Sequence, residues 1–486
     1  MIDLTMHEST LESAVNVARD KAIRIPTFKQ MRDPSLIPDS VKQELKEVGL
    51  WDLDPRNLFR INWHNEPTET GGGYSGVNFL ELPKALTGTD ARILVLEGKW
   101  FPTGAHKVGA AFGCLAPRLV TGQFDPAKTK AVWPSTGNYC RGGAYDSNLL
   151  GCESIAILPE GMSRERFDWL ESVAGEIIKT PGSESNVKEI FDKCNELRAS
   201  GQDLMIFNQF DEFGNYLWHY SVTGPAMAEV LESVMGPNDV FHGVTLTTGS
   251  AGTIASGDYL KQVYPTSKIA AGEAVQCPTM LHNGFGEHRI EGIGDKHIPW
   301  VHNVRNTDLA IGLDDEATMS IIRLFNEPEG VAYLESQGVS AELIEKLPLL
   351  GISGVGNMLS AIKMAKYYEL GANDVLITVG TDSMDMYGSR LEELNAERGE
   401  FSALDASASY ARYLMGAGID HVHELSYYDR KRIHNLKYYT WVEQQGKTYE
   451  EIQAQWYDPE YWTRIQGMAD PIDELIEAFN DRVGLS

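Results

Sequence analysis

Cysteine is scarce in this chain of 486 residues, and its spacing excludes the common cysteine frameworks. The cysteines are odd in number and form no C-x-x-C pair; they are Cys114, Cys140, Cys152, Cys194 and Cys277. A disulfide scaffold or a zinc ribbon is therefore not expected, and small buried thiols are typical of a reducing compartment. The histidines form no H-E-x-x-H motif, so we expect no catalytic metal.

Basic residues are also few relative to acidic residues. The sequence has 42 Lys and Arg against 69 Asp and Glu, a net charge of -27. Because most of such a surface repels polyanions, we expect neither nucleic acid nor an anionic membrane as a partner. No apolar run reaches membrane-spanning length, and Met1-Ile2-Asp3-Leu4 lacks the basic and apolar regions of a signal peptide. These absences favour a cytoplasmic protein.

Short apolar runs alternate with amphipathic segments from residue 93 onward, which predicts βα units around parallel sheets. The expected strands lie at 93–96, 131–133, 154–158, 177–178, 205–207, 243–246, 269–271 and 375–379. Four parts of the chain are expected. They are an N-terminal arm (1–60, with two helical patterns), a large domain (61–99 and 216–424), a smaller mobile domain (100–215) and a C-terminal extension (425–486).

Lys107 stands at an unusual place for a lysine. It follows the turn Pro102-Thr103-Gly104-Ala105-His106 and opens a segment with helical spacing. A helix N-terminus disfavours a cation, so its field favours the neutral amine that a carbonyl-reactive lysine needs. The alternative is a solvated lysine with no chemical role.

Three further polar turns follow predicted strands. Thr248-Gly249-Ser250-Ala251-Gly252-Thr253 precedes a helix and has the small residues and hydroxyls that suit a phosphate dianion, although a tight βα connection would look the same. Ser135-Thr136-Gly137-Asn138 would bind a carboxylate or merely start a helix. A third turn, 378–383, ends the last strand with hydroxyls and a carboxylate, at the sheet edge where doubly wound folds bind ligands.

Together these motifs resemble the fold-type II pyridoxal-phosphate (PLP) enzymes, the group of cysteine synthase, threonine synthase and tryptophan synthase β. The turn 103–107 resembles the tryptophan synthase β lysine motif, while 247–253 and His288-Arg289-Ile290-Glu291-Gly292-Ile293-Gly294 resemble cysteine synthase. Segments 351–354 and 387–389 continue in the same order, and the resemblance covers about residues 65–395. It implies an α/β, tryptophan synthase β-like fold with two doubly wound domains of parallel or mixed sheet. It also implies a homodimer that uses PLP.

The resemblance also implies roles for individual residues. Lys107 would form a Schiff base with PLP and move protons at the substrate Cα. The phosphate would bind at Thr248, Gly249, Ser250, Ala251, Gly252 and Thr253, with Gly354 beside the ring. Asn138 would face the ring hydroxyl, and Ser135, Thr136, Gly137 and Asn138 would hold the substrate carboxylate. Thr381, or alternatively Thr378 or Ser383, would face the pyridine nitrogen.

Such a neutral hydroxyl partner weakens the ring as an electron sink. It favours β-elimination and β-replacement through an aminoacrylate over transamination. The neighbouring Asp382 leaves this inference open.

The sequence departs from cysteine synthase in ways that bear on the substrate. Tyr139 and Arg141 stand near a position where cysteine synthases usually have a small Thr-Gly pair, which indicates a substrate of another shape. If Arg141 faces the substrate, that substrate would carry a second anionic group; the alternative is that Arg141 faces solvent. The loop 135–138 contains no Glu, which argues against tryptophan synthase. The terminal extensions resemble longer members such as the β subunit of 2-amino-4-oxopentanoate thiolase, and that alternative would require a small partner subunit. A third alternative is a non-catalytic binding protein of the same fold.

Overall fold

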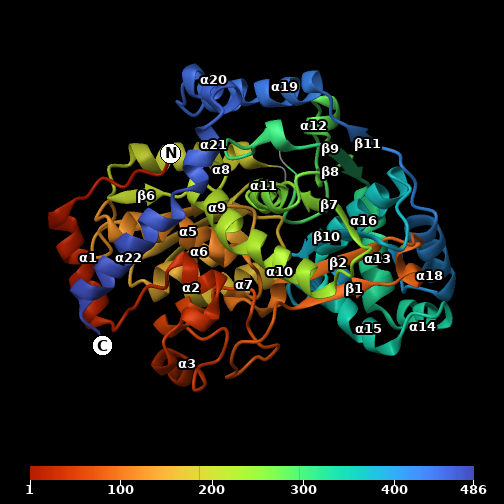
Figure 1. Ribbon diagram of the computed structural model, residues 1–486, viewed down its shortest axis with the longest axis horizontal. Helices are drawn as coiled ribbons and strands as arrows, with labels where there is room; N and C mark the ends of the chain where they lie inside the picture. The colour runs from red at the N-terminus through yellow and green to blue at the C-terminus, as the bar shows by residue number, and fades with distance from the viewer. Residues whose placement is uncertain (185, 295, 486) are drawn as a thin grey trace.

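Two β-sheets organise the chain in the computed structural model, which describes residues 1–184, 186–294 and 296–485 (Figure 1). The larger sheet has the strand order β1 (Phe79–Leu82), β2 (Arg92–Glu97), β10 (Asp374–Gly380), β7 (Val240–Thr247), β8 (Lys268–Ala274), β9 (Leu309–Leu313), β11 (Val422–Glu424). The smaller sheet has the order β5 (Glu176–Thr180), β4 (Ser154–Pro159), β3 (Lys130–Pro134), β6 (Leu204–Ile206). The predicted strands are all present.

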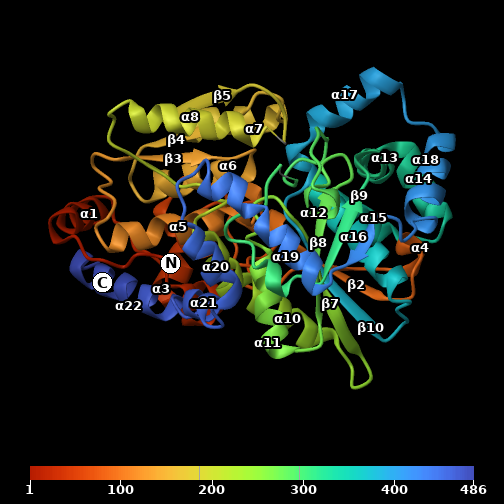
Figure 2. The ribbon, with the colours of Figure 1, turned by 90° about the horizontal axis from the view of Figure 1, so that it is seen from above.

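Helices cover both faces of each sheet. Those nearest the smaller sheet are α5 (Lys107–Val120), α6 (Asn138–Leu149), α7 (Arg164–Val173) and α8 (Val187–Ala199), and α9 (Phe213–Trp218) packs against α5. Those of the larger unit are α4 (Lys84–Thr87), α10 (Gly224–Val234), α11 (Ile254–Val263), α12 (Thr279–His282), α13 (Asp315–Asn326), α14 (Pro328–Ser336), α15 (Ala341–Lys346), α16 (Ile352–Tyr367), α17 (Gly388–Arg398) and α18 (Ala403–Ser409). Figure 2 shows the smaller sheet with α7 and α8 on one side of the molecule and the larger sheet on the other.

The smaller sheet is parallel throughout, and the larger sheet is parallel except for its two edge strands. Strand β2 shows why the chain forms such a sheet. Ile93 and Val95 enter the core that contains α13 and α16, whereas Leu94 and Leu96 enter the core that contains α5 and α11. A strand buried on both faces reads as a continuous apolar run, and this property made the α/β architecture predictable.

The two chain ends fold against each other. The arm contains α1 (Glu8–Asp20), α2 (Phe28–Arg32) and α3 (Asp39–Leu45), and the extension contains α19 (Tyr427–Asn435), α20 (Tyr449–Tyr457), α21 (Tyr461–Gln466) and α22 (Ala469–Val483). The expectation of two helical segments in the arm is wrong. Thr27 and Gln30 form a capping box that starts α2, and Pro38 precedes α3, so the proline-rich stretch begins helices as well as ending them. Helix α22 lies beside α1 at one end of the molecule (Figure 2).

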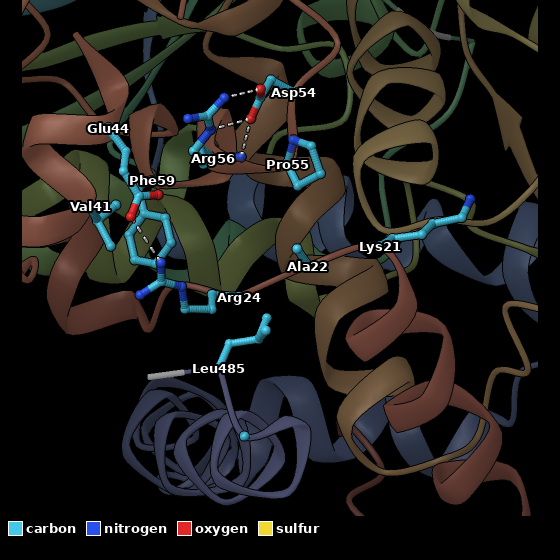
Figure 3. Close-up of a pocket in the computed structure, with 11 residues that line it drawn as sticks. Lys21, Ala22, Arg24, Val41, Glu44, Asp54, Pro55, Arg56, Phe59 and Leu485 are labelled. Carbon is cyan, nitrogen blue, oxygen red and sulfur yellow. Dashed lines mark hydrogen bonds and ion pairs between the residues drawn. The ribbon is translucent and has the colours of Figure 1, made fainter. Parts of the chain in front are cut away.

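A pocket of about 510 Å³ opens at this seam between arm and extension (Figure 3). Its guanidinium groups are neutralised by neighbouring carboxylates: Arg24 lies 3.5 Å from Glu44, and Arg56 binds both oxygens of Asp54. No site residue predicted from the sequence lines this pocket. This pocket is therefore not a candidate for the active site.

In the described part of the chain, no single helix has the length and apolar character needed to cross a membrane. Ala341–Leu349 and Ile352–Tyr367 pass that test only as a pair, and they are bent by 118°. The second of these segments is α16, which packs on β10 and β7 in the core of the larger unit.

The seam gives a first testable prediction. Asn480 accepts from the Ile25 backbone N–H at 3.0 Å and donates to the Ile25 carbonyl at 2.8 Å. Because Asn480→Ala strands both buried backbone groups, we expect it to lower the free energy of unfolding by about 1–3 kcal/mol in denaturant titrations. Glu474→Ala on the exposed face of α22 is the matched control. Equal stability of the two variants would show that the arm does not depend on α22.

Candidate active site

The polar turns predicted from the sequence meet around one cavity. Lys107 is the first residue of α5, Ser135–Asn138 joins β3 to α6, Thr248–Thr253 joins β7 to α11, and Thr381 follows β10. The lining residues are Lys107, Ser135, Thr136, Asn138, Tyr139, Glu184, Gln209, Phe210, Gly249, Ser250, Gly292, Ile293 and Thr381. Carboxyl ends of strands from both sheets form this cavity, as expected for an open α/β fold.

The hydroxyl of Ser250 is the centre of the cavity's hydrogen bonds. Its Oγ accepts from Lys107 Nζ at 3.2 Å, from Asn215 Nδ2 at 3.0 Å and from the backbone N–H of Gly252 at 3.4 Å. The lysine amine thus lies directly beside the turn predicted to bind phosphate. A lysine that is held here by a hydroxyl is not the solvated lysine of the alternative interpretation.

The turn 248–253 has the shape of an anion cradle. In the described residues, no protein acceptor is recorded for the backbone amides of Gly249, Ser250, Ala251 and Thr253, which precede α11. A Cβ at Gly252 would lie 2.0 Å from Asn215 Oδ1, and one at Gly249 would lie 2.9 Å from the Gly292 carbonyl. Backbone amides at a helix N-terminus, beside a lysine amine, fit the phosphate and the aldehyde carbon of PLP.

Arg141 supports the turn 102–106 that precedes Lys107. Thr103 in that turn has φ = 72°, which is strained for a β-branched residue. Its carbonyl accepts from Arg141 Nη2 at 2.7 Å, and Arg141 Nη1 donates to Asn138 Oδ1 at 3.3 Å. The alternative in which Arg141 faces solvent is wrong, because its side chain is buried and stacks on Trp169. Its guanidinium is also not among the groups that line the cavity.

The loop predicted to hold the substrate carboxylate is fixed by neighbours on three sides. Ser135 Oγ accepts from Gln209 Nε2 at 3.2 Å, and the Thr136 hydroxyl donates to Glu184 Oε1. Gly137 allows close packing, since a Cβ there would lie 2.6 Å from Arg166 Nη1. Tyr139 lines the cavity, but its ring packs edge-on against Trp133.

The Asn138 amide, expected to face the ring hydroxyl of PLP, donates to Asp382 Oδ2 at 2.7 Å. An amide nitrogen carries two hydrogens, so one donor is committed to Asp382 and one is left for a ligand. Asp382 also accepts from Tyr387 Oη at 2.6 Å, and burial raises the pKa of its carboxyl against the opposing effect of Arg166.

A buried ionic network joins the two sheet units behind this loop. Arg166 of α7 donates to Glu291 at 2.5 Å and to Tyr387 Oη at 2.7 Å, and it lies 3.8 Å from Asp382. Burial alone would lower the pKa of Arg166, but Tyr387, Glu291 and Asp382 outweigh it and raise the pKa. The charge of Arg166 is therefore retained inside the protein, where it holds the smaller unit against the larger one.

The three hydroxyl candidates for the pyridine nitrogen lie in different surroundings. Thr381 lines the cavity, whereas the Thr378 hydroxyl donates to the Thr245 carbonyl inside the sheet. Ser383 precedes a short 3₁₀ turn and does not line the cavity. Gly354 also lies outside the lining, in the first turn of α16 against Gly380.

Three polar side chains at the cavity were not predicted: Glu184, Gln209 and Asn215. Glu184 and Gln209 follow the carboxyl ends of β5 and β6, so the strand-end rule applied to every strand would have found them. Asn215 lies in α9 and gives no such signal. Across the described residues, no group of three or more His, Cys, Asp or Glu side chains is placed to hold a metal ion.

The network predicts a specific loss of stability. Glu291 accepts from both Arg166 and Arg390, so Glu291→Gln leaves a buried guanidinium poorly neutralised. We expect it to lower the free energy of unfolding by about 3 kcal/mol. Glu393→Gln removes an exposed partner of the same Arg390 and should change the stability by less than about 0.5 kcal/mol. A similar small loss for both variants in denaturant titrations would contradict this assignment.

Comparison with known proteins agrees with this geometry. A family model described as "Pyridoxal-phosphate dependent enzyme" matches residues 73–351. A cysteine synthase of Staphylococcus aureus is 28% identical over 294 residues, which span 59% of this chain and 84% of the relative. A probable cysteine synthase of Bacillus subtilis is 27% identical over 240 residues, 49% of this chain and 76% of the relative.

The crystal structure of a hydrogen sulfide-producing enzyme from Fusobacterium nucleatum is similar in fold. It has a TM-score of 0.55 and 22% sequence identity, covering 71% of this chain and 95% of that chain. The similarity confirms the tryptophan synthase β-like α/β architecture expected from the sequence. On the matched motifs, the cavity and the fold, this chain belongs to the family of pyridoxal-phosphate dependent enzymes.

Proposed function

We propose that this chain catalyses PLP-dependent β-elimination and β-replacement on an amino acid with an activated β-substituent. The observation that carries the proposal is the 3.2 Å contact between Lys107 Nζ and Ser250 Oγ, in the same cavity as the loop 135–138. A lysine amine, a phosphate cradle and a carboxylate-binding loop are the three parts that this chemistry needs. The cysteine synthases among the relatives support the same reaction class.

When bound, PLP supplies an electron sink for the pair released at the substrate Cα. Lys107 would hold the cofactor through its carbonyl carbon and then carry the proton to and from Cα. The backbone and hydroxyls of Ser135, Thr136 and Gly137 would bind the α-carboxylate, and the second Asn138 hydrogen would face the cofactor hydroxyl. Thr381 would present a neutral hydroxyl to the pyridine nitrogen, which disfavours transamination.

We propose further that the enzyme is a cytoplasmic homodimer in which residues 100–215 move as a unit against 61–99 and 216–424. No disulfide joins the five cysteines, which supports a reducing compartment. The Glu165 carboxylate of α7 accepts from the Ser389 N–H and hydroxyl, and such part-buried polar contacts can break and re-form while the buried Arg166 network keeps the units together. A thiolase β subunit with a small partner subunit has no support from the relatives reported above.

The attachment of the cofactor can be tested chemically. The purified protein should be yellow, and reduction with borohydride should fix the cofactor on the peptide that contains Lys107, as read by mass spectrometry. Lys107→Ala should lose both this label and turnover, since it removes the only amine among the described residues that line the cavity, and an amine is needed to form a Schiff base with the cofactor aldehyde. Label on another lysine would contradict the assignment.

The reaction class can be tested with small substrates. With O-acetylserine and sulfide the enzyme should form cysteine, and without sulfide it should form pyruvate and ammonia from the same substrate. Lys107→Ala, loaded with PLP, is the matched control. If a panel of β-substituted amino acids gave neither product, the proposed reaction would be wrong, even with PLP bound.

A further inference from the structure

Glu184 is a carboxyl group placed between two cavities. It follows β5, its side chain is buried, and it lines the cavity that contains Lys107. It also lines a second cavity of about 150 Å³, whose wall includes His288, Arg390 and the exposed residues Glu393 and Glu397. A group in this position can reach the reacting atoms on one side and exchange a proton toward solvent on the other.

The two oxygens of Glu184 have different surroundings. Oε1 accepts from the Thr136 hydroxyl, in the loop predicted to bind the substrate carboxylate. Oε2 is buried without a side-chain partner among the described residues, and the backbone N–H of Gly292 is the further donor that acts on this carboxyl. A carboxyl group has room for more hydrogen bonds than these, and the cavity that it lines is where a ligand group would supply one.

The charges that face Glu184 come from several elements. Arg166 of α7 and Glu291 of the loop after α12 act on its charge, His288 and Arg390 line the second cavity with it, and Lys107 lines the first. Burial raises the pKa of Glu184 to about 8, although Arg166 opposes the shift. At neutral pH the group is therefore mainly a carboxylic acid.

We propose that Glu184 is the general acid that protonates the leaving group at the substrate Cβ, and that the substrates accordingly include amino acids with a β-hydroxyl. The inference rests on the proposed function and deepens it. It is motivated by the position of the buried Glu184 carboxyl, which lines the cavity beside the loop 135–138, since a substrate bound there by its α-carboxylate presents its β-substituent within the same cavity. No other carboxyl group is among the described residues that line it.

Lys107 and Glu184 carry all the protons that this reaction moves. Lys107 takes the Cα proton, the double bond forms between Cα and Cβ, and the Cβ–O bond breaks with its electron pair on oxygen. The oxygen takes the proton of Glu184 and leaves as water, so Glu184 becomes a carboxylate. In replacement, that carboxylate takes the proton of the incoming thiol as the S–Cβ bond forms, and Lys107 returns a proton to Cα. Both side chains then regain their starting forms.

Comparison of two leaving groups tests the role. Hydroxide must be protonated as it leaves serine, whereas chloride leaves β-chloroalanine without a proton. Glu184→Gln keeps the acceptor for Thr136 and removes the acid. We expect kcat/KM for L-serine to fall at least about 100-fold more than kcat/KM for β-chloro-L-alanine, within the usual range of general acid catalysis. With wild-type enzyme, turnover of serine should fall as the pH rises through about 8.

Thr136→Val separates this role from mere positioning. It breaks the hydrogen bond to Glu184 but keeps the acid, so both substrates should lose rate to a similar extent. An equal loss for both substrates in Glu184→Gln would overturn the inference and leave the proposed function standing. The same follows if the wild type uses β-chloroalanine but not serine. Inactivity of the wild type with both substrates would overturn the proposed function and the inference together.

A readout independent of turnover is the infrared difference between wild type and Glu184→Gln. It should contain a protonated carboxyl band at neutral pH that disappears as the pH rises through about 8. An ionised carboxylate at neutral pH would overturn the inference. Thermal melting and cofactor absorption report whether Glu184→Gln folds. If it does not, Glu184→Asp takes its place. In that variant kcat/KM for serine should again fall more than kcat/KM for β-chloroalanine, but by a smaller factor.

Discussion

The buried guanidinium of Arg166 is the interaction on which the site depends most. It comes from the smaller sheet unit and binds Glu291, Tyr387 and the Thr136 carbonyl, with Asp382 close by. A charge removed from water needs such partners, and here the partners also support loops that line the cavity. Because Asp382 also holds the Asn138 amide, the position of the loop 135–138 follows from this network. The two halves of the cavity are assembled by a single set of buried charges.

Lys107 is also held in place by a small number of contacts. Arg141 donates a hydrogen bond to the strained turn that precedes Lys107. Lys107 is the first residue of α5, and its amine donates to the Ser250 hydroxyl. The local strain at Thr103 and the cation at a helix start are both unfavourable taken alone. They persist because the surrounding contacts fix the amine where a phosphate-bearing aldehyde would meet it.

Much of this was predictable from the sequence, and the reasons are physical. Strands buried on both faces, such as 93–96, predicted the α/β fold. The small-residue turns after such strands predicted the Lys107 turn and the loops at 135–138 and 248–253. These features could be predicted because they are local in sequence. Long-range contacts were not predictable in this way. The burial of Arg141, the capture of the Asn138 amide by Asp382 and the approach of Glu184 to Thr136 join residues from distant segments. Likewise, two helical patterns were expected in the arm, whereas Thr27 and Pro38 each begin a separate helix after α1.

The central claim is that Lys107 carries the cofactor in a site that activates the β-position of an amino acid. The most direct measurement is the visible absorption spectrum of the purified enzyme on mixing with O-acetylserine. We expect a new band at longer wavelength that decays as pyruvate accumulates, and no such band in Lys107→Ala loaded with PLP. An unchanged spectrum with this and other β-substituted amino acids would contradict it.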